Sequence, residues 1–418
     1  MPKAHKPPLS ALFALNKPTG IPSMTLLNRL QPLFSASALF RDPNKPNQDN
    51  SAKRGARGGR RGGRGRRDDK VKMGQGGTLD PLADGVLVVG TNAATKSLSR
   101  FLDCTKEYRA IGLVGCSTDS YDSQGKRVRT CAWDGVTRQS VEDALARFRG
   151  EIEQTPPIYS ALKMDGKPLY EYARTNTPLP RPIPPRKVTV FSLELVNFVD
   201  GADHAYEYPA DELDEGARSE LERLEKMVKE GRTEVPAEDE VAAAPEPAPT
   251  SSEPTARPPT FEIKMTVSSG TYVRSIVHDL GLALGSAAHV VKLTRTRQGE
   301  FVLEPPSAST TVSAGEGAAM GGEGAAQGGE GEGVEVDGEA AAAAAPAAAA
   351  ADGAGEPAPV PSPVELDTFT GGCVEWTLLE AALKAQDEAK KSGTEVEGRD
   401  ADGWLEWERD LLSKCKEV

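Results

Sequence analysis

The stretch from Gly74 to Gly85 reads GQGGTLDPLADG and leads directly into an apolar run, Val86 to Val89. Its glycines permit positive φ angles and a close approach of the backbone to a ligand. Pro81 biases the preceding residue, Asp80, away from helical geometry. A carboxylate held on such a loop at the entrance of a strand suits a nucleophile or a base. The competing interpretation is an ordinary turn in which the aspartate caps its own backbone, and other parts of the chain decide between the two.

Two long stretches elsewhere in the chain cannot form a packed core. Residues 237–259 are rich in alanine, proline and glutamate, and residues 305–363 consist mainly of alanine, glycine, glutamate, proline and serine. Neither holds enough large apolar side chains to offset the entropy lost on ordering, so we expect both to be disordered. The patterned sequence that remains is the size of one large domain.

The order of patterned and unpatterned segments predicts the domain organisation. We expect one domain over residues 11–303, interrupted by an Arg-Gly-rich insert at 35–70 and an acidic insert at 200–259. A disordered linker then covers residues 304–372, and an acidic helical segment, 373–418, follows it.

Strand and helix patterns within that domain predict its fold class. Residues 108–116 and 127–131 have the pattern of two strands joined by a turn, and residues 188–198 alternate apolar and polar side chains as a half-buried strand does. Ser140 begins a capping box for a short helix that ends at Gly150. We therefore predict an α/β (α+β) fold with a mixed, largely antiparallel sheet flanked by helices.

Charge is distributed unevenly along the chain, whose net charge is −12. Residues 1–200 carry 32 lysines and arginines against 19 aspartates and glutamates, whereas residues 304–418 carry 7 against 24. A basic folded part is what a polyanion-binding surface requires. The tract at 53–67, KRGARGGRRGGRGRR, favours nucleic-acid contact through phosphates and stacking. A localisation signal or an inert linker is the alternative interpretation of that tract.

Composition also disfavours several functional classes. The five cysteines form no C-x-x-C pair, and with only four histidines we expect no metal site. The cysteine pattern fits a reducing, intracellular compartment. No apolar run approaches the length of a transmembrane helix, so we expect no membrane association. A secretory signal peptide is not expected, while a short mitochondrial presequence stays open.

Five further motifs accompany the Asp80 loop. They are NKPTG at 16–20, KEYR at 106–109, PPIYSALK at 156–163 with GKPLYEYAR at 166–174, GTYVR at 270–274 and LTRTRQGEF at 293–301. Together with GQGGTLDPLADG, and in this order, they resemble the TruB-type pseudouridine synthases, which isomerise a uridine at position 55 in the T loop of tRNA. The resemblance covers nearly all of the patterned sequence and implies a eukaryotic, fungal-like member with the pseudouridine synthase catalytic fold. Bacterial members add a small RNA-binding domain of the PUA type, and we predict no PUA domain here.

The resemblance implies three catalytic residues. Asp80 is the implied nucleophile, and whether it attacks C1′ or C6 of the nucleotide, or helps the base to leave, stays open. Tyr108 is implied to stack on the target base and to move the ribose proton, the alternative being a tyrosine that packs in a hairpin. Arg274 is implied to pair with Asp80 and keep it ionised. Its alternative is a surface arginine at an electrostatically poor helix start.

The same resemblance assigns substrate contacts to seven further residues: Lys17, Gln75, Gly77, Thr78, Leu79, Tyr272 and Leu293. Tyr272 would line the uracil pocket and Leu293 would close it, although both residue types usually pack in cores. A uridine inside a folded T loop must flip out to react. Bacterial members usually carry a histidine at the place of Gln75, and that histidine helps to fill the space left by the flipped base. Glutamine can hydrogen-bond a base edge but cannot titrate near neutral pH.

The implied reaction breaks and re-forms a glycosidic bond without redox chemistry or external energy, so we expect no cofactor. The expected partner is the T arm of tRNA, and T-loop-like sites in mRNA stay open. We expect a monomer in the nucleus and cytoplasm, with the mitochondrion open as a further location. The alternative function is a non-catalytic RNA-binding or tRNA-folding protein. The joint presence of Asp80, Tyr108 and Arg274 argues against it, because a binding protein has no need for that set.

Overall fold

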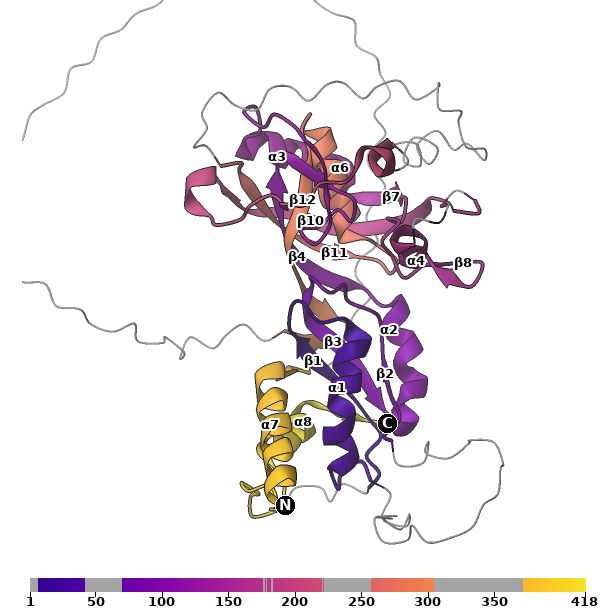
Figure 1. The fold of residues 1–418 in the computed structure, drawn as a ribbon, viewed down its shortest axis with the longest axis vertical. Coiled ribbons are helices and arrows are strands. Elements are labelled where there is room, and N and C mark those ends of the chain that lie inside the picture. The colour runs from indigo at the N-terminus through magenta and orange to yellow at the C-terminus, as the bar shows by residue number, and fades with distance from the viewer. Residues whose placement is uncertain are drawn as a thin grey trace, which may run out of the picture. The chain divides into compact units, whose positions relative to one another are not determined.

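The computed structural model describes residues 7–41, residues 70–219 except 176, 178 and 182, residue 221, residues 257–303 and residues 371–418 (Figure 1). The Arg-Gly tract at 53–67 and most of the predicted acidic insert lie outside the described residues. So does nearly all of the linker predicted at 304–372.

One large mixed sheet organises the described residues (Figure 1). Its main strands follow one another in space in the order β14 (Cys373–Glu375), β1 (Ala11–Lys17), β3 (Asp84–Thr91), β12 (Ala288–Gln298), β4 (Lys106–Val114), β11 (Thr260–Val267), β10 (Arg186–Val199) and β7 (Gly150–Gln154). Short strands β2 (Met73–Gln75), β13 (Phe301–Val302) and β15 (Lys416–Glu417) attach to β3, β12 and β1. Among the described strands, only the pairs β1–β14 and β3–β12 of this sheet are parallel. The predicted fold class is confirmed.

Helices and two small hairpins accompany the sheet. The helices are α1 (Ser23–Ala36), α2 (Ser99–Asp103), α3 (Arg138–Leu145), α4 (Leu169–Arg174), α6 (Val273–Ala283), α7 (Trp376–Ser392) and α8 (Glu406–Lys414), with 3-10 turns at Asn92–Leu98, Ala146–Phe148 and Gly201–Asp203. The hairpins pair β5 (Cys116–Thr118) with β6 (Arg127–Thr130), and β8 (Lys163–Met164) with β9 (Lys167–Pro168). Within these ranges, no helix is long and apolar enough to cross a membrane.

The apolar run that follows the Asp80 loop forms β3, and both faces of this strand are buried. Leu87 and Val89 belong to the largest apolar cluster, which includes side chains of α1, whereas Val86 and Val88 pack in a second cluster. Alternate residues of a strand point to opposite faces, so the two clusters lie on opposite sides of β3. Burial on both faces explains why the run is continuously apolar. The Asp80 loop therefore precedes a strand that is fixed from both sides.

Two local predictions differ from the structure. The strand predicted to begin at Tyr108 lies in β4, but β4 pairs with β11 and β12, and the hairpin is β5–β6 further along the chain. Gly115 has a φ of +88°, and this turn separates β4 from the hairpin. Helix α3 is capped by Thr137, whose side chain accepts from Ser140 N, so Ser140 lies in the first turn and is not the cap residue. The sequence pattern located the strand but not the strands with which it pairs, and it located the helix but not its cap residue.

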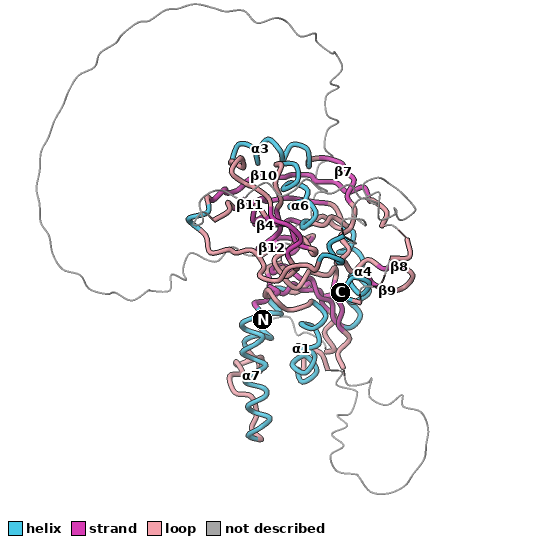
Figure 2. Tube along the Cα trace, turned by 45° about the horizontal axis from the view of Figure 1, so that its top comes forward, coloured by secondary structure: helices cyan, strands magenta, loops and turns pink. Residues whose placement is uncertain are grey.

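The segment 371–418 belongs to the same sheet, in addition to forming the helices that its sequence predicted. Strands β14 and β15 both pair with β1, on the side away from β3. Trp407 of α8 is 2% exposed, and its ring centroid lies 5.3 Å from that of Phe34 in α1. Figure 2 shows α7 beside α1, and Gln386 Nε2 of α7 donates to Pro32 O of α1 at 3.5 Å. This acidic segment therefore completes the core of the domain.

Both predicted inserts begin later in the structure than their composition indicated. Helix α1 continues to Ala36, and Leu39 and Phe40 beyond it are buried. After β10 the structure describes nearly all residues up to 219, and the Tyr208 hydroxyl donates to Val114 O at 2.9 Å. Single anchoring side chains carry no periodic signal, so composition could not place these boundaries.

Candidate active site

The loop between β2 and β3 carries Asp80, and its backbone is tied to the segment between β1 and α1. Ser23 uses its hydroxyl twice, because Oγ donates to Leu79 O at 3.0 Å and accepts from Leu79 N at 3.1 Å. Thr19 Oγ1 donates to Leu82 O at 2.6 Å. The residues on both sides of Asp80 are therefore fixed by side chains from the first 23 residues of the chain.

Lys17, the last residue of β1, lies beneath this loop and is fully buried. Its Nζ donates to three carbonyl oxygens, those of Pro18, Pro81 and Ala83, at 2.9, 3.3 and 2.5 Å. Burial lowers the pKa of Lys17 to about 8, while the charges of Asp84 and Asp80 act in the opposite direction. The sequence predicted a substrate contact for Lys17. In the structure its ammonium group binds the backbone of the loop, so its position is that of a support for Asp80.

Strand β12 holds the glycine turn of the same loop. Arg295 is 1% exposed, and it donates Nε to Val86 O at 2.7 Å and Nη2 to Gly77 O at 3.2 Å. Gln298 Nε2 donates to Gly76 O at 2.6 Å. Gly77 has a φ of +135°, which favours glycine at this position. The last of the motifs found in the sequence thereby fixes the start of the Asp80 loop.

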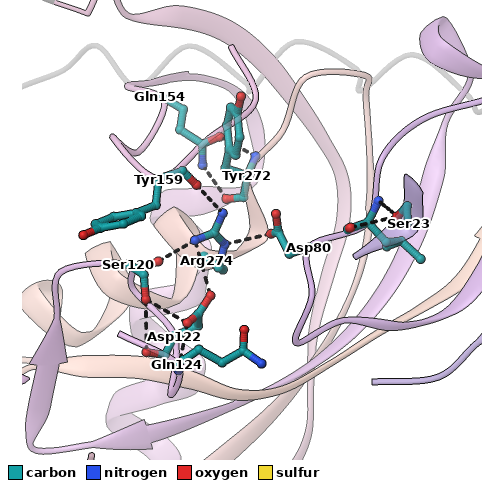
Figure 3. A network of polar contacts seen from close by, with 10 residues as sticks. Ser23, Asp80, Ser120, Asp122, Gln124, Gln154, Tyr159, Tyr272 and Arg274 are labelled. Atoms are coloured by element: carbon teal, nitrogen blue, oxygen red, sulfur yellow. Dashed lines mark hydrogen bonds and ion pairs between the residues drawn. The ribbon is translucent and has the colours of Figure 1, made fainter. Parts of the chain in front are cut away.

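Arg274, near the start of α6, is the centre of the candidate site (Figure 3). Its Nε lies 2.8 Å from Asp80 Oδ2, and its Nη1 lies 3.3 Å from Asp122 Oδ2. Nη1 also donates to Ser120 O at 2.6 Å, and Nη2 donates to Tyr159 O at 2.9 Å. The Arg274 side chain is 4% exposed, whereas the Asp80 side chain is 37% exposed. The structure thus places the predicted pair together, as a buried, fixed cation beside a carboxylate that a ligand can reach.

Asp122 is a second carboxylate on Arg274, and sequence reasoning missed it. Its side chain is 6% exposed, and its Oδ1 accepts from Ser120 Oγ at 2.7 Å and from Gln124 N at 3.0 Å. Burial raises the pKa of Asp122, and the positive charge of Arg274 opposes that rise. The segment 119–125 has the composition of an ordinary turn, so no local signal marks this residue. Asp122 joins the site because this turn and α6 meet in the fold.

Tyr108 of β4 and Leu293 of β12 lie on neighbouring strands. Tyr108 is opposite Arg295 and Leu293 is opposite Ala110, which makes Tyr108 and Leu293 diagonal neighbours. Their exposed fractions are 9% and 4%, and Leu79 of the loop belongs to the same apolar cluster. Such a placement suits the wall of an apolar pocket and also suits packing. The roles of these three residues in base binding stay predictions.

Gln75 and Thr78 contact each other within the loop. Gln75 Nε2 donates to Thr78 Oγ1 at 3.0 Å, and Thr78 is exposed. Within the part of the chain that the structure describes, the buried Oε1 of Gln75 has no hydrogen-bond partner. Buried polar atoms normally have one, so this acceptor is suited to a donor on a bound ligand. The predicted substrate contacts of both residues stay predictions.

Tyr272 precedes α6 and is fixed through its main chain. Gln154, at the end of β7, accepts from Tyr272 N through Oε1 at 2.7 Å and donates Nε2 to Tyr272 O at 2.9 Å (Figure 3). Gln154 is 4% exposed and is another residue that sequence reasoning missed. This pair of hydrogen bonds sets where α6 begins and therefore where Arg274, two residues later, is placed.

The chemistry available at this site comes from one accessible carboxylate and one permanent cation. The guanidinium of Arg274 places a positive charge 2.8 Å from Asp80 Oδ2. Across the described ranges, no group of three or more histidine, cysteine, aspartate and glutamate side chains is arranged to hold a metal ion. The arrangement is therefore suited to nucleophilic or base chemistry at a substrate that docks over Asp80.

Comparisons with known proteins give the family of the chain. A family model described as TruB family pseudouridylate synthase (N terminal domain) matches residues 66–207. The tRNA pseudouridine synthase 4 of Schizosaccharomyces pombe is 40% identical over 330 residues, which cover 70% of this chain and 79% of that protein. The tRNA pseudouridine synthase 4 of Saccharomyces cerevisiae is 37% identical over 318 residues, which cover 71% of this chain and 78% of that protein.

A human relative and a solved structure are more distant. Pseudouridylate synthase TRUB1 of Homo sapiens is 32% identical over 296 residues, covering 71% of this chain and 63% of the human protein. The crystal structure of a Cbf5-Nop10-Gar1 complex contains a chain that matches 69% of this chain and 49% of its own length, with 20% identity and a TM-score of 0.36. The identity and coverage of the two fungal proteins show that the chain belongs to the TruB family of pseudouridylate synthases.

Proposed function

We propose that this protein isomerises a uridine of tRNA to pseudouridine and that the uridine is the one at position 55 in the T loop. Membership of the family supports the reaction class. Two fungal relatives are named tRNA pseudouridine synthase 4, which supports tRNA as the substrate. The observation that carries the proposal is the contact of Arg274 with Asp80, because it provides a fixed and accessible nucleophile.

The reaction breaks the bond between N1 of uracil and C1′ of the ribose, turns the base, and joins C5 to C1′. The product has the same atoms as the substrate, since the proton lost at C5 is balanced by a proton gained at N1. An anion can begin this exchange by attack on C1′ or C6, or by assisting departure of the base. We assign that part to Asp80, because Arg274 binds its Oδ2 and leaves Oδ1 for the substrate.

Arg274 orients this carboxylate and places a positive charge beside it. Its guanidinium is anchored by Ser120 O, Tyr159 O and Asp122, so it is already in place before a substrate binds. An electrostatic partner that is fixed in advance stabilises developing charge without a reorganisation cost. The buried anchors of Arg274 thus support a catalytic site more than a passive RNA-binding surface.

The target base must leave its stack before it can reach Asp80. We assign its reception to Tyr108 and Leu293, which lie on the neighbouring strands β4 and β12, and to Tyr272 at the start of α6. Gln75 then contacts the RNA from which the base has left, and its unsatisfied Oε1 supports that role. Glutamine cannot titrate near neutral pH, so this contact is one of recognition and not of proton transfer.

The proposed substrates include T-loop-like sites in mRNA. We propose further that the protein acts as a monomer and does not bind a membrane. Its proposed location is the nucleus and the cytoplasm, with the mitochondrion as a further one. Proteins recognise folded RNA largely by shape, which supports any RNA that presents the same loop as a substrate. The excess of lysine and arginine over acidic residues in residues 1–200, 32 against 19, supports contact with the phosphate backbone.

A stem-loop RNA with the T-arm sequence tests the proposal. Wild-type protein is incubated with this RNA and with a second RNA in which cytidine replaces the uridine at position 55 while all other uridines are kept. We expect pseudouridine at position 55 in the first RNA and at no position in the second. Binding of both RNAs without pseudouridine in either would instead assign the protein a non-catalytic RNA-binding function.

A further inference from the structure

We infer that Tyr159 is a positioning residue that couples the arm, defined as residues 155–183 except 176, 178 and 182, to the pair formed by Asp80 and Arg274. The inference rests on the proposed function and deepens it. Of the motif PPIYSALK at 156–163, only the main-chain oxygen of Tyr159 has so far received a role in the site.

The arm is a small unit between β7 and β10. It contains the hairpin β8–β9 and helix α4, which pack on an apolar cluster of their own made of Met164, Leu169, Tyr172 and Ile183. Figures 1 and 2 show β8 and α4 outside the large sheet. Because this cluster is separate from the main one, the placement of the arm against the sheet depends on contacts at its root.

Tyr159 lies at that root and contacts the site twice. Its main-chain oxygen accepts from Arg274 Nη2 at 2.9 Å, and its hydroxyl donates to Asp119 Oδ2 at 3.2 Å (Figure 3 shows the first contact). Asp119 belongs to the same turn as Ser120 and Asp122, which hold Nη1 of the same guanidinium. Tyr159 therefore connects the arm both to Arg274 and to the turn that anchors it.

The hydroxyl contact is between partly desolvated groups. Burial, helped by the charge of Asp119, raises the pKa of Tyr159 to about 12. Burial also raises the pKa of Asp119, while hydrogen bonds from Lys126 N and from Tyr159 lower it. The phenol therefore keeps its proton and remains a donor to Asp119 at neutral pH.

The donors of Arg274 show what the main-chain contact contributes. A guanidinium has five N–H donors in one plane. Asp80 forms an ion pair with Nε without a hydrogen bond there, and Ser120 O and Asp122 contact Nη1. Within the described residues, Tyr159 O is the hydrogen-bond acceptor for Nη2. A displacement of Tyr159 would release one corner of the planar group and allow it to tilt away from Asp80.

A neighbouring contact acts in the same direction. Gln154, immediately before the arm, binds the main chain of Tyr272 at both N and O. Where the arm joins the sheet, Gln154 thus fixes the start of α6, and Tyr159 fixes the guanidinium group of Arg274. The position of the arm consequently determines the geometry of the ion pair on which Asp80 depends.

The variant Tyr159→Phe tests this inference, because it removes the hydroxyl and keeps the ring and the main-chain carbonyl. With the T-arm RNA we expect kcat to fall about tenfold, the usual effect of losing one hydrogen bond to a charged group. KM is expected to stay near the wild-type value, while the melting temperature falls because Asp119 loses a hydrogen bond. The matched control is Tyr172→Phe, whose lost hydrogen bond, to Met164 O at 3.0 Å, lies wholly inside the arm. For that variant we expect a lower melting temperature and an unchanged kcat of the folded protein.

Two outcomes would overturn the inference: a wild-type kcat in Tyr159→Phe, or an equal loss of kcat in both variants. If wild-type protein forms no pseudouridine, the proposed function fails by itself, and NMR of the Arg274 Nη2–H hydrogens, which donate to Tyr159 O, then decides the inference. These hydrogens should exchange with water faster in Tyr159→Phe than in wild type or Tyr172→Phe. Equal exchange in all three proteins would reject the role of Tyr159.

Discussion

Asp80 and Asp122 share one guanidinium, but their surroundings differ. The Asp80 side chain is 37% exposed and the Asp122 side chain is 6% exposed. A buried carboxylate with its own hydrogen bonds is a stable counter-ion, whereas an exposed one can meet a substrate. Asp122 therefore anchors Arg274, and Arg274 in turn orients Asp80.

Replacement of Arg274 by lysine should separate the contribution of the positive charge to catalysis from that of the shape of the guanidinium group. Lysine keeps the positive charge, but a single ammonium group cannot meet the four acceptors that surround the guanidinium. We expect the kcat of Arg274→Lys for pseudouridine formation to fall roughly 100-fold, the equivalent of about 3 kcal/mol. The control is Arg109→Lys, because Arg109 is 47% exposed in its pair with Glu262 at 2.9 Å. A wild-type rate in Arg274→Lys would show that charge alone suffices.

Lys17 makes stability depend on pH in a defined direction. Its pKa in the folded protein is about 8, below the ordinary value of 10.5. Between these values the unfolded chain binds this proton and the folded protein does not, so the contribution of Lys17 to the free energy of unfolding rises with pH. Urea unfolding of wild type and Lys17→Met should therefore give a stability difference that shifts in favour of wild type from pH 8 to pH 10. A difference that is constant or shifts the other way would contradict the burial of a charged Lys17.

Among the elements, β1 depends on a segment that is more than 350 positions away in the sequence, because β14 and β15 pair with it. Helix α8 follows with the buried Trp407 against Phe34. Strands of two or three residues are too short to show a periodic pattern, and so is a single tryptophan. The sequence therefore predicted the helices of this segment but not its place in the sheet.

Truncation of Trp407 measures how much this segment contributes. Trp407→Ala should lower the free energy of unfolding by about 3–5 kcal/mol, the usual cost of emptying a buried aromatic site. The control is Trp404→Ala, because Trp404 lies in the same segment and is only half-buried. Thermal or urea unfolding gives both values. Equal losses for the two variants would mean that the segment does not complete the core.

Some of the elements around the site could be predicted from the sequence, and others could not. The strand after the Asp80 loop and the helix after Tyr272 follow local patterns and are found as β3 and α6. The pairing of β4 could not be predicted, because a strand pattern does not name its neighbour. Asp122 and Gln154 were missed for the same reason, since each acts on a segment far away in the chain.

For the whole molecule, the sequence separates patterned segments from unpatterned stretches, and the charge of a stretch does not decide between them, because the acidic segment 371–418 belongs to the sheet. The resemblance carried by the motifs implied that Arg274 pairs with Asp80, and the structure places these two side chains in contact. Composition predicted the unpatterned stretches but not their edges, which depend on single contacts such as that of Tyr208 with Val114 O.

The Arg-Gly tract tests whether RNA affinity extends beyond the described domain. Deletion of residues 53–67 should weaken binding of tRNA and flatten the slope of log affinity against log salt concentration, because fewer phosphate contacts release fewer counterions. Deletion of residues 321–335, an equally long piece with no lysine or arginine, is the control and should leave the slope unchanged. Unchanged affinity and slope after deletion of the tract would assign it a role other than RNA binding.

Release of tritium from C5 of the target uridine measures the step assigned to Asp80, because C5 loses its hydrogen when it bonds to C1′. Wild-type protein in excess over T-arm RNA labelled at that carbon is expected to release the label fully into water. Asp80→Asn has nearly the same shape without the charge, so we expect it to bind the RNA with similar affinity and to release no label. Release by Asp80→Asn at the wild-type rate would contradict the assignment of Asp80 as the reacting group.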